Sequence, residues 1–463
     1  MTTEAKPLPY ANKGNLVEGP VRKHLIRLAA PMTWGIMMMI SFQLVNVFFI
    51  SLLGDTKILA AISFTFPVTY LLFSFLMGFS IAMASVVSRL IGQGGQEIVQ
   101  RVTSHGLLFG FLISLLITAV GIWGHDALFR MMGANEEMLP LIKQYMHIWF
   151  AGLIFVSVPL IGNAAIRANG DSATPAMIMT GAALLNVVLD AVLIFGLLGF
   201  PRLELQGAAI GSVIANGFAF VACFYVLVFK QRLFSFRVAF AQIKMFGDSV
   251  KRLMFIALPA GITNSIQPMV NAIILSLLAK HNVEAVAAFG VVTRIEAFAF
   301  VILMGLAVGM APIIGQNWGA KRYDRVNETL HLAMQFNILW SLAIALVLGV
   351  FAKPIAGIFS DDPQVIFYAS HFFWMVPFSY ALGNLVNGWA SAFNAMGMPQ
   401  RAFVMIIVRM VLLMIPAVYI GNHFGGVIGI FIAIAAVNVV TGLFFHLTSW
   451  QFCKQRAAEA VSV

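Results

Sequence analysis

The chain is dominated by apolar stretches long enough to cross a lipid bilayer as α-helices. About 20 mainly apolar residues suffice for one crossing, and stretches of this length recur along the whole sequence. Of all residues, 60% are hydrophobic and only 10% are charged, whereas a soluble domain carries about 25% charged residues. In hydrocarbon, only helices and closed barrels satisfy their own backbone hydrogen bonds. The sequence therefore predicts an all-α, multi-pass membrane protein.

The apolar stretches define twelve candidate transmembrane helices. They cover residues 28–53, 59–84, 102–124, 144–166, 175–198, 206–229, 254–279, 286–313, 328–352, 367–392, 402–421 and 425–450. The predicted organisation is an N-terminal tail (1–27), a six-helix N-lobe (28–229), a basic linker (230–253), a six-helix C-lobe (254–450) and a C-terminal tail (451–463).

Basic residues are distributed unevenly between the two ends of these helices. If the N-terminus is cytoplasmic, most of the 28 lysines and arginines fall in cytoplasmic tails and loops. Because positively charged loops stay on the cytoplasmic side, both termini are expected to face the cytoplasm. The net charge of +10 then reflects topology and contact with membrane lipids, and no nucleic-acid partner is expected.

The two halves of the sequence resemble each other. NVFFISLLG from Asn46 matches NAIILSLLA from Asn271, and LMGFSIAM from Leu76 matches LMGLAVGM from Leu303. Each match falls in the same ordinal helix of its half, and equivalent helices run in the same direction. Parallel repeats of this kind are related by an axis along the membrane normal. Two such lobes enclose a central cleft, which favours a transporter over a channel.

Several motifs resemble the multidrug and toxic compound extrusion family. They are GLAVGMAPIIGQNWGAKRYDRV at 305–326, RLIGQGGQEIVQRV, RANGDSATP and LNVVLD. The resemblance covers essentially the whole chain and implies twelve helices in two pseudo-symmetric lobes around a central cleft. It also implies a monomeric antiporter that exports drugs and toxic cations, mostly amphipathic, in exchange for H⁺ or Na⁺. Neither a cofactor nor an enzymatic activity is expected.

Within that family, the N-lobe looks closest to the DNA-damage-inducible F branch. That branch carries an acid in the first helix and an Asn-x-x-x-Asp pair in the fifth. The pair is present as Asn186 and Asp190, but Asn46 stands where the first-helix acid is expected. In another branch the seventh helix carries an acid at the place of Gln267, and Ser212 occupies the place of a sixth-helix hydroxyl. The resemblance therefore implies a cation-coupling group of Asp190, Asn186, Asn46 and Ser212.

Asp190 interrupts the apolar stretch LLNVVLDAVLIFGLLG. An ionised side chain at the centre of a membrane helix costs about 2.5 to 3.5 kcal/mol even on lenient insertion scales. Asn186 lies one helical turn away on the same face, where its amide can bond to either form of the carboxyl. The pair could exchange a proton, or Asp190 and Asn186 could help to bind Na⁺. Carboxylates inside membranes are rarely kept for packing alone, so a functional role is favoured.

Other polar and aromatic residues of the spans are candidates for lining the substrate cavity. They are Phe42, Gln43, Asn163, Gln267, Arg294, Glu296 and Asn387. Glu296 could attract a cationic substrate, or it could belong to an Arg–Glu network that fixes helix packing. Arg294 and Glu296 are two residues apart and cannot share a helix face, so they need separate partners. Arg409 is expected to be structural, bonded to a carbonyl or an asparagine.

Pro31 is the predicted hinge of the first helix. Proline removes one helix hydrogen bond and permits a bend, and members of the resembled family are thought to bend this helix during ion exchange. In the alternative interpretation Pro31 merely starts the helix, where proline is tolerated.

Two other functions are alternatives to antiport. A lipid-linked oligosaccharide flippase of a related class would have a strongly cationic cavity, and it often has more spans. An embedded enzyme would need clustered catalytic groups, whereas His105, His147 and His371 are scattered along the sequence. The sequence contains no ATP-binding motif, so the favoured energy source is an ion gradient.

Overall fold

The computed structural model describes residues 15–52 and 56–461, and these residues are almost entirely helical. The predicted tail residues 1–14, the end of the first span with its following loop at 53–55, and the last two residues lie outside the described part. The N-lobe consists of α1 (Val21–Ser51), α2 (Thr56–Gly92), α3 (Gln96–Met131), α4 (Leu139–Ala168), α5 (Ala173–Phe195), α6 (Glu204–Tyr225) and the short π-helix η1 (Val226–Lys230).

The second half follows after a linker that carries α7 (Phe236–Ala241) and the 3₁₀ turn η2 (Ile243–Met245). The C-lobe consists of α8 (Phe246–Ala279), α9 (Val283–Gly319), α10 (Tyr323–Val350), α11 (Ala352–Phe359), α12 (Pro363–Met375), η3 (Pro377–Ser379), α13 (Tyr380–Met396), α14 (Pro399–Ile407), the π-helix η4 (Val408–Met414) and α15 (Ile415–Val461).

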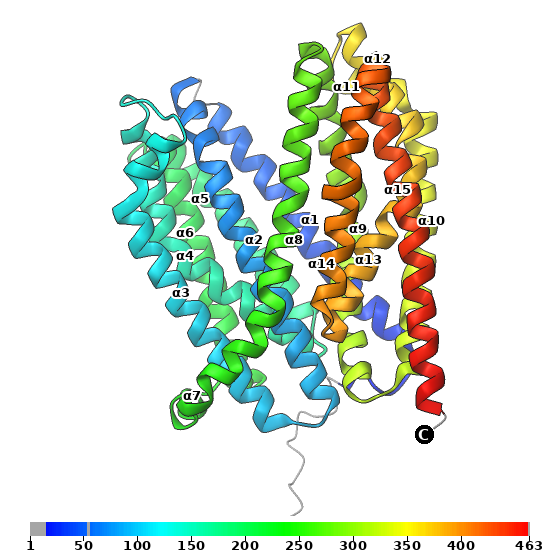
Figure 1. Ribbon diagram of the computed structural model, residues 1–463. Helices are drawn as coiled ribbons and strands as arrows, with labels where there is room; N and C mark the ends of the chain where they lie inside the picture. The colour runs from blue at the N-terminus through cyan, green and yellow to red at the C-terminus, as the bar shows by residue number, and fades with distance from the viewer. Residues whose placement is uncertain (1–14, 53–55, 462–463) are drawn as a thin grey trace, which may run out of the picture.

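These helices provide the twelve predicted crossings. Among the described residues, 11 helical segments are long and apolar enough to cross a membrane, and the last of them runs from Pro399 to Glu459. This last segment crosses twice, because the chain turns back at Gly426 (Figure 1). The backbone there has φ 54° and ψ −135°, a conformation that is open to glycine and closed to other residues. The predicted fold class is confirmed.

The helices extend beyond the apolar stretches that predicted them. α1 begins at Val21 instead of residue 28, α8 begins at Phe246 inside the predicted linker, and α15 continues to Val461 through the predicted tail. An apolar stretch marks only the part of a helix in hydrocarbon, and the hydrogen-bonded spiral continues into the polar headgroup region. The tenth span is interrupted between α12 and α13 at Pro377, which has no backbone N–H to donate.

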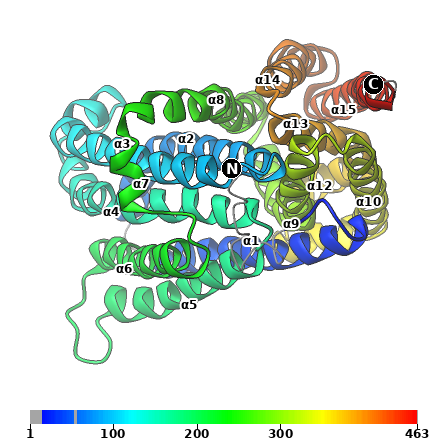
Figure 2. The ribbon, with the colours of Figure 1, turned by 90° about the horizontal axis from the view of Figure 1, so that it is seen from below.

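Two helices cross from one lobe to the other. In Figure 1, α1 starts beside the C-lobe and rises towards the N-lobe, whereas α8 starts beside the N-lobe and rises towards the C-lobe. Figure 2 places these two helices on opposite edges of the molecule. Along α1, Ala29 packs against Gly309 of α9, and Gly35 packs against Ala176 of α5. On the other edge, α8 packs against α2 and α3 of the N-lobe and against α14 and α15 of the C-lobe.

The lobes touch each other at the end of the molecule that carries the described termini and the linker, referred to below as the terminal end (Figures 1 and 2). There the Ser85 hydroxyl of α2 donates a hydrogen bond to the Asn394 carbonyl of α13. Gly315 of α9 lies so close to Ser88 that a Cβ atom would not fit. The space between the lobes is therefore closed at the terminal end.

The close approach of α1 to α9 predicts that a glycine-to-alanine substitution on α9 lowers the stability of the protein only where the two helices touch. A Cβ atom at Gly309 would lie 2.7 Å from the Ala29 Cα. We therefore expect Gly309→Ala to destabilise the protein by about 1 to 3 kcal/mol, as overpacking does. On the same helix, a Cβ atom at Gly290 would have no described atom within 4 Å, so Gly290→Ala should be neutral or stabilising. Thermal unfolding in detergent measures both, and equal midpoints would contradict the tight packing.

Candidate functional site

The N-lobe holds a buried carboxyl group between two helices. Asp190 of α5 is fully buried. Its Oδ2 accepts a hydrogen bond from the Asn46 Nδ2 of α1 at 2.7 Å, and its Oδ1 accepts one from the Asn186 Nδ2 at 2.8 Å. Three of the four residues expected to form the coupling group thus lie together. Asn46, which replaces an expected acid, is bonded directly to the remaining acid.

α6 covers this carboxyl group with its backbone. A Cβ atom on Gly211 would lie 2.6 Å from the Asp190 Oδ1, so only glycine allows the observed approach. Ser212 follows directly, but its identified hydrogen bond involves its backbone oxygen, which accepts from the Asn216 Nδ2 at 2.8 Å. An apolar cluster that includes Ile194 adjoins the site.

No lysine or arginine in the described ranges forms an ion pair with Asp190. A lone buried carboxylate is costly unless it is protonated or bound to a cation. The site can therefore exchange a proton or a small cation. Na⁺ would need oxygen ligands, and the amides of Asn46 and Asn186 now direct their nitrogens at the carboxyl. Both amides would have to rotate to bind Na⁺, whereas their present orientation suits an ionised carboxylate.

The C-lobe contains a cavity of about 620 Å³ that is enclosed mainly by α8, α9, α10, α13, η4 and α15. Three of the predicted cavity residues line it, namely Gln267, Glu296 and Asn387. Tyr70 and Ile81 of α2 complete its wall from the N-lobe. Side-chain amides dominate the polar lining: Asn264, Gln267, Asn271, Asn337, Asn384, Asn387, Asn394 and Asn438. Asn271 is the repeat equivalent of Asn46, so the equivalent positions serve different sites in the two lobes.

Glu296 has a phenol partner. The Tyr380 hydroxyl of α13 donates a hydrogen bond to the Glu296 Oε1. Tyr380 is buried and stands edge-on to Phe300, with ring centroids 4.9 Å apart. Arg294 is exposed and does not line the cavity, so the two charged residues point in different directions, as their spacing predicts. The structure shows no Arg294–Glu296 ion pair within the described chain.

Arg409 of η4 is buried in the wall of the same cavity. Its Nη1 donates to the Gly383 carbonyl at 2.9 Å and to the Asn387 Oδ1 at 3.4 Å. Its Nη2 donates to the Asn438 Oδ1 at 2.8 Å. These are the carbonyl and asparagine partners that the sequence predicts. Among the described residues, the Nε–H finds no acceptor and no carboxylate pairs with this cation.

The sequence analysis missed two members of these networks, Tyr380 and Asn438. Asn438 carried a usable signal, because it is a lone amide in an otherwise apolar stretch of the twelfth span. Tyr380 carried none, since tyrosines are common in membrane proteins.

The remaining predicted residues lie elsewhere. Phe42 and Gln43 belong to α1 and Asn163 to α4, and none of them lines the C-lobe cavity. Asn163 is buried, and its Oδ1 accepts no hydrogen bond from the described part of the chain. Pro31 lies inside α1, so the alternative that it merely starts the helix is wrong. The residues before it form further helical turns on which α9 packs, and proline leaves the carbonyl of Arg27 without its usual donor.

Comparison with known proteins identifies the family. The MatE family profile matches residues 31–192 and 259–420, one match in each half. A FAD transporter of Shewanella oneidensis is 36% identical, with 96% of this chain and 97% of that protein aligned. The multidrug export protein MepA of Staphylococcus aureus is 25% identical over 89% of this chain and 90% of its own. The Vibrio cholerae MATE transporter VcmN in the bent form has a TM-score of 0.88 and 28% identity over 95% of this chain and 98% of its own.

The contact between α6 and Asp190 predicts a local spectroscopic effect. Gly211→Ala should push the carboxyl away from its amide donors, because the added methyl group would lie only 2.6 Å from the Asp190 Oδ1. The infrared band of this carboxyl group, assigned by comparison with Asp190→Asn, should shift in frequency. Gly217→Ala on the same helix is the control, since its added methyl group would have no described atom within 4 Å. Identical shifts, or none, in the two variants would contradict the observed geometry.

Proposed function

The chain belongs to the MatE family of membrane transporters, and from that premise we propose that it exports amphipathic organic compounds in exchange for an ion bound at Asp190. The observation that supports this proposal most directly is the buried carboxyl group held between α1 and α5 by two amide donors. Because a helix that crosses between the lobes supplies one donor, a change at the carboxyl can alter how the lobes are connected.

Proton binding offers the simplest coupling chemistry at this site. An ionised carboxylate accepts hydrogen bonds at both oxygens, whereas a protonated carboxyl must donate one. Asn46 or Asn186 then has to turn its amide oxygen towards Asp190 or lose its bond. If Asn46 loses its bond to Asp190, this contact no longer holds the end of α1 to α5. α1 can then bend at Pro31, where a helix hydrogen bond is missing. We therefore propose H⁺ as the coupling ion and Pro31 as the hinge, with Na⁺ as the alternative.

Asp190→Asn should abolish coupled export because it preserves the shape of the side chain and removes the titratable group. The measurement is substrate transport by purified protein in vesicles, with proton and sodium gradients imposed separately. Asp361→Asn, at an exposed position between α11 and α12, controls for the loss of a negative charge. Transport by Asp190→Asn at the wild-type rate under a proton gradient would eliminate Asp190 as the coupling residue.

The cavity suggests what the substrate looks like. Its described lining combines many amides and several aromatic rings with two charged side chains, Glu296 and Arg409. Amphipathic cations of the kind expected from drug-exporting relatives would lie near Glu296. The relative MepA is named for multidrug export, which supports this first class.

A second substrate class is favoured by Arg409. A buried guanidinium without a carboxylate partner is costly in a membrane, and guanidinium groups bind phosphates well. The Shewanella relative is named a FAD transporter, and a flavin dinucleotide combines flat rings with an anionic pyrophosphate. The amides and aromatic rings that line the cavity are suited to bind the flat rings of the dinucleotide, and Arg409 is suited to bind its pyrophosphate.

The two classes can be separated by paired substitutions. Glu296→Gln should reduce the transport of a cationic dye and leave that of a flavin dinucleotide largely unchanged. Arg409→Lys keeps the positive charge but loses the planar donor geometry, so it should reduce flavin transport more than dye transport. Competition between dye and flavin in vesicles containing each variant is the measurement. Equal losses for both substrates in both variants would show that these residues only support the fold.

The cellular setting is part of the proposal. The terminal end carries Lys230 at the end of η1, the linker with Arg232 and Lys244, and also Arg322 and Arg401. This distribution supports cytoplasmic termini in a prokaryotic plasma membrane. The protein is proposed to act as a monomer.

A further inference from the structure

A short segment that precedes the first helix is built into the C-lobe. This segment, residues 15–18, is called the strap here. Leu16 is fully buried although it lies outside any helix. It belongs to an apolar cluster with Met310, Ile313 and Ile314 of α9 and with Leu330 of α10. Removing an apolar side chain from water stabilises its buried position, so Leu16 anchors the strap to the C-lobe.

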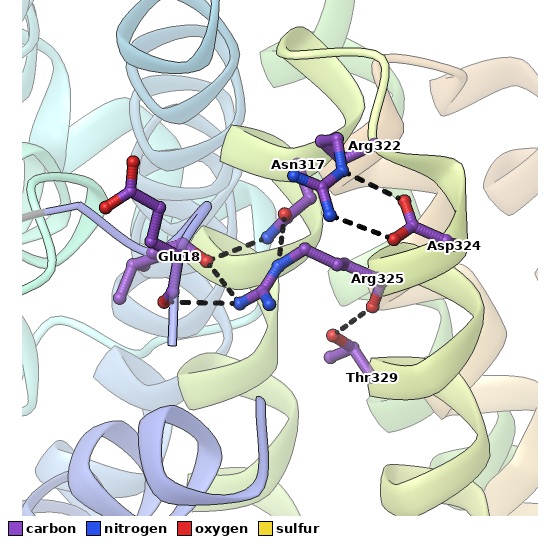
Figure 3. Close-up of polar contacts among 7 residues, drawn as sticks. Glu18, Asn317, Arg322, Asp324, Arg325 and Thr329 are labelled. Carbon is purple, nitrogen blue, oxygen red and sulfur yellow. Dashed lines mark hydrogen bonds and ion pairs between the residues drawn. The ribbon is translucent and has the colours of Figure 1, made fainter. Parts of the chain in front are cut away.

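Polar contacts fix the strap on both sides of Leu16 (Figure 3). The Asn317 Nδ2 donates to the Leu16 carbonyl at 3.1 Å. The Arg325 Nη2 donates to the same carbonyl at 3.1 Å and to the Glu18 carbonyl at 3.4 Å. The Arg325 Nε donates to the Asn317 Oδ1 at 3.0 Å. The end of α9 and the start of α10 thus hold the strap by its backbone carbonyls.

Gln316 connects the strap to the other lobe. The Leu16 backbone N–H donates to the Gln316 Oε1 at 3.0 Å. The Gln316 Nε2 in turn donates to the carbonyl of Ala168, the last residue of α4, at 2.8 Å. One fully buried amide therefore bonds the strap with its oxygen and the N-lobe with its nitrogen. Because the strap holds the oxygen, the nitrogen is oriented towards Ala168.

We propose that the strap is a latch that holds the terminal end of the transporter closed, and that Gln316 is the residue through which it acts. Opening this end has to break the bond from Gln316 to Ala168, since its two partners belong to different lobes. Without the strap, the Gln316 amide would be free to turn away from Ala168. The strap also leads directly into α1, whose other end is bonded to Asp190 through Asn46. Movement of α1 can thereby withdraw the strap, a step that rests on the proposed exchange cycle.

The test measures how often the terminal end opens. Ser85→Cys places a thiol in the closed contact between the lobes, and a membrane-impermeant maleimide reacts with it only when that contact opens. Cys453→Ser removes one native thiol. The other, Cys223, is buried in the N-lobe core and serves as an internal control for unfolding. Peptide mass spectrometry then reports both labelling rates in the purified protein.

Two substitutions release the strap in this background. Arg325→Gln removes the bonds to the Leu16 and Glu18 carbonyls, and Leu16→Ala removes the buried anchor. We expect each to raise the labelling rate of the Ser85→Cys thiol by roughly tenfold, the effect of losing about one charge-assisted hydrogen bond or part of a buried side chain. Arg322→Gln is the matched control, because Arg322 is a neighbouring arginine that pairs with Asp324 and does not contact the strap (Figure 3).

The expected result is faster labelling in both strap variants, no change in Arg322→Gln, and continued protection of Cys223. Labelling rates in both strap variants equal to that of Arg322→Gln would overturn the proposal. Loss of Cys223 protection in both strap variants would also overturn it, because the strap would then support the fold as a whole. The assay needs neither substrate nor an ion gradient, so its failure is distinct from a failure of Asp190 coupling.

Discussion

The hydrogen bond from Asn46 to Asp190 connects the buried carboxyl group of the N-lobe to the architecture of the whole transporter. It joins α1 to α5 at a fully buried carboxyl group of the N-lobe. α1 continues from this bond past Pro31 to a tight contact with α9 of the C-lobe. In the proposed exchange cycle, a proton or cation at Asp190 would therefore act on a helix that both lobes share. In hydrocarbon no water can replace this bond. When the carboxyl group changes its charge or its bound ion, the protein side chains bonded to it therefore have to rearrange.

The two lobes descend from one repeat but use it differently. The fifth crossing of the chain carries Asp190, and its counterpart in the C-lobe, the eleventh crossing, carries Arg409. The carboxyl of Asp190 lies in a tight pocket closed by the backbone of Gly211, whereas Arg409 lies in the wall of a large cavity. One lobe therefore offers a site of ionic size, and the other offers room for an organic molecule. The proposed antiport needs both.

Close contact between the two lobes closes the terminal end of the molecule. Helix backbones approach each other there because glycines such as Gly319, which lies against the backbone of Arg89, leave no side chain between them, and small residues are what allow close helix contacts in membranes. A few hydrogen bonds, including the one from Gln316 to Ala168, fix the relative position of the lobes in this contact. Net contributions of about 0.5 to 1.5 kcal/mol for each bond are small enough for the proposed ion exchange to reverse. Closure can therefore be specific and still reversible.

The sequence by itself determined the membrane crossings, their repeat and the pairing of Asn186 with Asp190, because these depend on local composition and on the period of a single helix. It also predicted the kind of partners that Arg409 finds. Only the tertiary structure decided that Asn46 bonds Asp190, that Tyr380 bonds Glu296, and that the large cavity lies within the C-lobe. These outcomes depend on which helix faces meet and at what depth. That choice is made by the packing of residues far apart in the sequence, which no single-helix pattern encodes.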